Sequence, residues 1–144
     1  MGAEAIGLLH SAVTGLVATP TYSAVECNNT NTLEERAGDP KNAGYRIGLV
    51  RAIATAIAGG ATSITWYLSE DAAGLKGITN PVSSTIQKHA AADTAGWIAQ
   101  SLSDVPWMET KQWATRGKLW FHGYTNAGTV SVEVGITWTQ LRAG

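Results

Sequence analysis

Residues 118–139 read KLWFHGYTNAGTVSVEVGITWT, and this stretch decides the fold class. Its second half places a large apolar residue at every other position: Val130, Val132, Val134, Ile136 and Trp138. Strict alternation with a period of two is typical of a β-strand that has one buried face. Burial of each such side chain contributes at most roughly 1.5–3 kcal/mol. We therefore predict a strand that packs on a core through this face.

A second strand is predicted just before it, over 118–124. The intervening residues 125–128 read TNAG, and Asn and Gly readily adopt the positive φ angles of tight turns. The sequence thus predicts a β-hairpin over 118–139. Because an isolated hairpin is only marginally stable in water, it has to belong to a larger sheet.

Residues 45–58 alternate with apolar residues on both faces, as expected for a strand buried on two sides. A helix competes, because Leu49, Ile53 and Ile57 are spaced four apart. Residues 63–68 alternate clearly, whereas 82–104 suit either short strands or a helix that opens at Asn80-Pro81. Several short strands between Gly- and Pro-marked turns predict an all-β, antiparallel β-sandwich, Ig-like or jelly-roll-like.

Residues 1–44 show no sustained period. We expect two parts, an extended N-terminal arm or irregular region over 1–44 and a β-sandwich domain over 45–144. The sparse apolar residues of the first part gain stability by lying in a groove of the same domain or of a neighbour. The alternative is that they form the first strands of the same sandwich. The candidate interface residues of this segment are Leu8, Val13, Leu16 and Val17.

The amino-acid composition limits the classes of partner that we expect. A net charge of -1 without any basic block makes nucleic acid an unexpected partner. A charged content of 15%, below the usual value of about 25%, tolerates close packing of many copies. The apolar stretch 6–18 follows Glu4 with no Lys or Arg before it and is too short to cross a bilayer. We expect neither a targeting segment nor a membrane span.

No catalytic or metal-binding motif is found. The three His residues lie far apart, and Cys27 has no cysteine to pair with. We therefore expect no enzyme activity, no metal and no cofactor. Six Trp against one Phe is unusual, and Trp is favoured at interfaces and on sugar-binding faces. The candidate interface tryptophans are Trp107, Trp113 and Trp120, and those for stacking on a sugar are Trp97, Trp113 and Trp120.

Two stretches carry a resemblance: GATSITWYLSED at residues 60–71 and GKLWFHGYTNAGT at residues 117–129. They resemble small β-sandwich structural proteins of tailed bacteriophage virions, which decorate capsids or line tails. The likeness extends over about residues 45–142 and assigns no functional residue. It implies a subunit present in many copies, made in the host cytoplasm and built into the virion, which contacts itself, for example as a trimer, and other virion proteins such as the major capsid protein.

The leading functional hypothesis is therefore a virion structural protein, a capsid decoration or stabilising subunit that acts through protein–protein contacts. A tail, tail-tip or fibre subunit is the near alternative. A carbohydrate-binding β-sandwich module is the alternative from another class.

Overall fold

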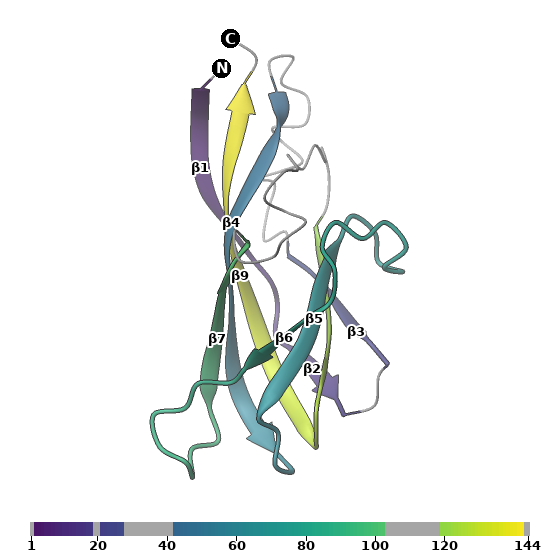
Figure 1. Ribbon diagram of the computed structural model, residues 1–144, viewed down its shortest axis with the longest axis vertical. Coiled ribbons are helices and arrows are strands. Elements are labelled where there is room, and N and C mark those ends of the chain that lie inside the picture. Colours follow the sequence, from purple (N-terminus) through teal and green to yellow (C-terminus); the bar gives the residue numbers. More distant parts are fainter. Residues whose placement is uncertain (1, 19–20, 28–41, 103–118, 143–144) are drawn as a thin grey trace.

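The computed structural model describes residues 2–18, 21–27, 42–102 and 119–142. In these residues the structure contains nine β-strands and no α-helix. The strands form two antiparallel sheets that pack against each other (Figure 1). The predicted all-β antiparallel sandwich is confirmed. No helix that could span a membrane occurs in the described residues.

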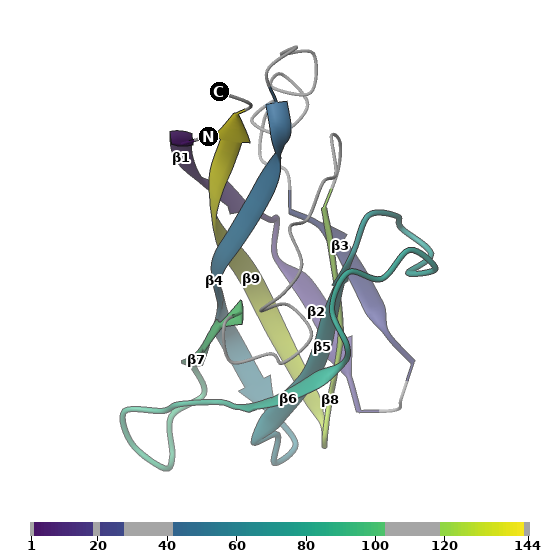
Figure 2. The same ribbon diagram turned by 45° about the horizontal axis from the view of Figure 1, so that its top comes forward.

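The larger sheet has five strands in the order β1-β9-β4-β7, with β2 also paired to β9. Its members are β1 (Gly2–His10), β2 (Thr14–Val17), β4 (Asn42–Ala58), β7 (Gly96–Ser101) and β9 (Thr129–Arg142). The smaller sheet has four strands in the order β3-β8-β5-β6. These are β3 (Ser23–Glu26), β5 (Ser63–Ser69), β6 (Val82–Thr85) and β8 (Trp120–Thr125). Figure 2 shows β3, β5 and β8 on one side and β1, β4 and β9 on the other.

The core lies between the sheets and is closed by large side chains from both. Trp66 of β5 stacks on Phe121 of β8, with ring centroids 5.8 Å apart and an interplanar angle of 15°. The Trp66 indole N–H donates to Ser84 Oγ at 2.9 Å, so its polar edge is satisfied inside the core. The five alternating apolar residues of β9 are all buried, which confirms the predicted face.

The predicted β-hairpin is wrong, although both of its strands exist. β8 pairs with β3 and β5, whereas β9 pairs with β1, β2 and β4. Residues 126–128 therefore carry the chain from one sheet to the other. Alternation shows that each strand has a buried face, but two strands that face each other across a core have the same alternation as two paired strands.

Two sheet-crossing turns pack together at this corner. Gly128 has a φ of +58°, and a Cβ atom there would collide with the carbonyl oxygen of Ala58, at the end of β4. The Asn126 side chain accepts hydrogen bonds from the backbone N–H groups of Thr62 at 2.9 Å and Ser63 at 3.1 Å. The turn after β8 thus fixes the turn between β4 and β5.

The N-terminal segment contributes strands to both sheets. β1 and β2 pair with β9 of the same chain, and β3 pairs with β8. Ser11 bridges β1 and β2, because its N–H donates to the Val134 carbonyl and its Oγ accepts from the Val134 N–H, both at 2.9 Å. β1, β2 and β3 thus lie within the two sheets, and β4 extends across residue 44. The division into an arm and a sandwich domain stays a prediction.

Residues 42–58 form a strand and not the competing helix, and residues 82–85 and 96–101 form strands as well. The expectation that β4 is buried on two sides is wrong for this chain. Val50, Ala52 and Ala54 face the core, whereas Leu49 and Ile53 are 38% and 37% exposed. Leu49 and Ile53 of β4 therefore point away from the core, whereas Ile47 and Ile57 of the same strand are buried.

Candidate functional site

Exposed apolar side chains gather on one side of the molecule. In the described residues, seven large hydrophobic side chains are exposed, and all but Leu75 belong to the five-stranded sheet or to the β1–β2 connection. These six are Leu8, Val13, Val17, Leu49, Ile53 and Trp97. Single exposed apolar residues need no explanation, but a contiguous group marks a contact surface.

A β-bulge determines which residues of β4 point outward. The register of β4 against β9 shifts between Ile47 and Val50, so Gly48 and Leu49 are both outward. The Leu49 N–H donates to Thr137 Oγ1 at 2.8 Å, which satisfies a backbone donor that the bulge takes out of the ladder. Glycine suits position 48, since a Cβ atom there would lie 2.8 Å from the same oxygen and would displace the Thr137 side chain.

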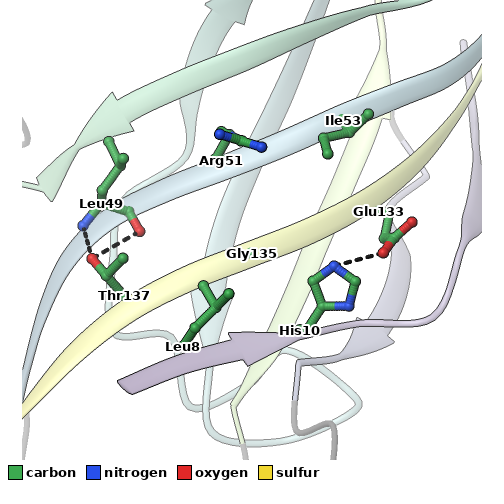
Figure 3. Close-up of a pocket in the computed structure, with 8 residues that line it drawn as sticks. All are labelled: Leu8, His10, Leu49, Arg51, Ile53, Glu133, Gly135 and Thr137. Atoms are coloured by element: carbon green, nitrogen blue, oxygen red, sulfur yellow. Dashed lines mark hydrogen bonds and ion pairs between the residues drawn. The ribbon is translucent and has the colours of Figure 1, made fainter. Parts of the chain in front are cut away.

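A hollow of about 310 Å³ lies on this outer face, over β1, β9 and β4 (Figure 3). Gly135 is at its centre, opposite His10 on one side and Arg51 on the other. Because Gly135 has no side chain, the floor of the hollow is backbone. The other lining residues are Leu8, Leu49, Ile53, Glu133 and Thr137.

A second hollow of about 520 Å³ lies across β4, over β7. Trp97 forms its outer side and stands opposite Ile53 in the sheet register. The Trp97 backbone is held by Gln87, whose N–H donates to the Trp97 carbonyl at 2.7 Å and whose carbonyl accepts from the Trp97 N–H at 2.9 Å. Leu49, Arg51 and Ile53 line both hollows and form a ridge between them.

Three ionisable side chains, His10, Glu133 and Arg51, sit on this apolar face. His10 Nε2 lies 2.6 Å from Glu133 Oε1. Arg51 is exposed, and no ion pair or hydrogen bond joins its guanidinium to another described residue. Such a mainly apolar surface with a few polar groups is typical of a binding site.

On the outer face of the four-stranded sheet, residues 70–79 fold over Ser69 and His122, whereas Tyr67, Trp120 and Tyr124 stay partly exposed. Ser69 Oγ and His122 Nε2 are 2.6 Å apart, and both side chains are buried. His122 is only 3% exposed. Burial lowers the pKa of its imidazole, although the Asp71 carbonyl and carboxylate oppose this.

The direction of the hydrogen bond between Ser69 and His122 does not suit a nucleophilic serine. Ser69 Oγ donates its single proton to the Asp71 carbonyl at 2.6 Å, so it accepts from His122 Nε2–H. A general base needs the reverse, an unprotonated imidazole nitrogen that accepts from the serine. Burial also raises the pKa of the Cys27 thiol to about 12, which keeps it protonated. In the described residues no three His, Cys, Asp or Glu side chains converge to hold a metal ion.

The predicted interface residues are divided by the structure. Leu8 and Val17 are exposed on strands of the larger sheet and Val13 is exposed in the β1–β2 connection, but Leu16 is fully buried and faces the core. Trp120 is half-buried on β8 of the other sheet. Trp107 and Trp113 lie outside the described residues. The sequence reasoning missed the ridge of β4, although the apolar residues on both faces of that strand were the signal.

Comparison with known proteins adds little to this geometry. No protein-family model matches the chain, and no curated protein matches it either. Among solved structures it is similar to the CBM22-1 and GH10 modules of the Clostridium thermocellum endo-1,4-β-D-xylanase 10B, in complex with xylohexaose, at 11% identity and a TM-score of 0.33. The match covers 96% of this chain and 26% of that chain. At this level of similarity the likeness carries no argument about function.

Proposed function

We propose that the protein is a structural subunit of a bacteriophage virion that binds a neighbouring virion protein through the outer face of its five-stranded sheet. The observation that carries the proposal is the gathering of exposed apolar side chains on that face. The resemblance of residues 60–71 and 117–129 to virion β-sandwich proteins gives the kind of assembly. Its role is mechanical, since a stiff sandwich positions apolar groups against a neighbour.

A capsid decoration or stabilising role is the specific form of the proposal: copies of the chain sit on a shell of the major capsid protein, and the outer face of the five-stranded sheet contacts the neighbouring virion protein there. A tail, tail-tip or fibre subunit would use the same face. Electron microscopy of labelled particles separates these positions directly. Label on the capsid shell supports the decoration role, and label on the tail supports the alternative.

The binding face is tested with a pair of matched variants. Ile53→Lys places a charge on the ridge of β4, whereas Leu75→Lys places the same charge at an 86% exposed position in the loop over the other sheet. We expect Ile53→Lys to weaken binding to purified particles at least tenfold and Leu75→Lys to leave it unchanged. Equal binding by wild type and Ile53→Lys would contradict the proposal.

A carbohydrate-binding role is the second candidate, and exposed Trp97 favours it. Trp97 is 45% exposed and lines a hollow that Arg51 also lines. An aromatic ring next to a charged donor can stack on a sugar and hydrogen-bond its hydroxyls. Saturable change in tryptophan fluorescence on titration with host-surface oligosaccharides, lost in Trp97→Ala, would support this role. No response at millimolar sugar would exclude those oligosaccharides as ligands.

A further inference from the structure

The ridge of β4 is an uncovered second apolar face. A strand with apolar residues on both sides is normally buried on both sides. Here Val50, Ala52 and Ala54 are covered by the core, while Leu49 and Ile53 remain exposed. The pattern of this strand therefore calls for a cover that the described part of the chain does not supply.

The positions of the charged residues on this face indicate which kind of molecule binds there. Arg51 stands opposite Gly135, and Ile53 stands opposite Glu133, so these four outward residues form a small square. Arg51 and Glu133 occupy one diagonal of the square, and Ile53 and Gly135 occupy the other. In Figure 3, Glu133 is joined to His10, whereas Arg51 lies along β4 with no contact drawn to it.

We propose that the occupant is a second copy of this chain, docked face to face about a two-fold axis. An axis along the Ile53–Gly135 diagonal exchanges the two ends of the other diagonal. It therefore pairs Arg51 of each copy with Glu133 of the other, as a self-complementary two-fold contact requires. Ile53 then meets its own counterpart near the axis, and the bare backbone at Gly135 allows close approach.

The size of the face predicts a weak contact. Four strands at a spacing of about 4.8 Å and five residues at about 3.3 Å per residue give the paired surface a width of roughly 14 Å and a length of roughly 13 Å. This is well below the roughly 800 Å² per partner of a standard stable interface. The dimer should therefore form at micromolar or higher concentration, and it becomes strong only where many copies are held together. The inference deepens the proposed function, because it uses the same face and names the copy as the neighbour.

The test is sedimentation of the full chain over about 1 µM to 1 mM, a range that brackets weak association. We expect a monomer–dimer equilibrium that Arg51→Glu and Glu133→Arg each weaken at least tenfold. The double variant, Arg51→Glu with Glu133→Arg, should recover dimerisation to within about threefold of wild type, since each added charge again meets its opposite. Lys88→Glu changes the same charge elsewhere and should leave dimerisation unchanged.

Three results would overturn the inference: a monomer at every concentration, a closed trimer, or a double variant as weak as the single ones. The two proposals fail separately. A monomeric protein that still binds particles overturns the self-pairing alone. A protein that pairs with itself yet binds no particle overturns the proposed function alone.

Discussion

The outer faces of the two sheets differ in how far other described residues of the chain cover them. Over the four-stranded sheet, residues 70–79 form a cover that buries His122 and Ser69 in a hydrogen-bonded network. Over the five-stranded sheet, Leu49 and Ile53 stay exposed around two hollows. A sandwich needs only its inner faces to fold. Among the described residues, the chain thus supplies its own cover near His122, whereas the ridge of β4 is the place where we propose that another molecule binds.

The largest effect is expected at the inner face that both sheets share. Val134→Asp buries an unpaired carboxylate at a fully buried position, so we expect loss of soluble folding, a cost above about 4 kcal/mol. The next residue points outward, and a Cβ atom at Gly135 would lie 3.5 Å from its nearest neighbour, an ordinary contact. Gly135→Ala should therefore fold. Expression and thermal melting of both variants check this, and a soluble, normally melting Val134→Asp would show that the inner face is misassigned.

A substitution in the loop over His122 should lower the free energy of unfolding less than Val134→Asp does. Gly74 has a φ of +74°, and a Cβ atom there would collide with the Tyr67 hydroxyl. Gly74→Ala should lower the free energy of unfolding by about 2–4 kcal/mol, since backbone strain and overpacking add. Gly60→Ala is the matched control, because Gly60 has a φ of +80° with nothing within 4 Å of an added Cβ. It should cost only about 1–2 kcal/mol, the positive-φ cost alone. Equal losses in urea denaturation would contradict a tight cover.

The same cover should respond to pH. Because burial lowers the pKa of His122 in the folded protein, the unfolded chain binds its proton first as the pH falls. The contribution of His122 to stability is thus full above its ordinary pKa of about 6.5 and declines as the pH falls from there towards the folded pKa. Asp71, whose pKa is lowered by the backbone N–H of Lys76, contributes in a separate window below its usual 3.8.

Urea denaturation at pH 7.5 and pH 5.5 measures this decline in the wild-type protein. His122→Gln keeps a hydrogen-bonding side chain without the titration and should lose most of the pH dependence in that range. If His122→Gln declines as steeply as wild type, the titrating group is elsewhere.

The smallest effect on stability is expected on the open face. Ile53→Lys and Leu75→Lys both replace an exposed apolar side chain, so each should change the free energy of unfolding by less than about 0.5 kcal/mol. Differential scanning calorimetry at low protein concentration measures both. A large loss in Ile53→Lys alone would mean that the ridge of β4 supports the fold and not an interface.

The sequence predicted which residues form strands better than it predicted which strands pair with one another. Alternation over 130–138 identified the buried face of β9, because that pattern depends only on which side meets the core. It could not tell that β8 lies in the opposite sheet, since pairing is set by the turn after Thr125 and its contacts with Ala58 and Thr62. The burial of His122 was likewise missed, because it depends on a loop that comes more than forty residues earlier.

The candidate site was only partly foreseen for the same reason. Leu8, Val13 and Val17 were identified as apolar residues too sparse to form a core, and they are exposed. Leu16 fitted the same description, but its register against Val130 turns it inward. Leu49 and Ile53 were read as buried, because composition shows that a face is apolar and not whether the same chain covers it.

Hydroxyl-radical footprinting of the free and particle-bound protein tests the central claim most directly. Oxidation of Leu49, Ile53 and Trp97 reports on the open face, and oxidation of Leu75 reports on the covered one. The account predicts that binding protects the first three side chains and leaves Leu75 as reactive as before. Protection of Leu75 with unchanged oxidation of Trp97 and Ile53 would contradict it.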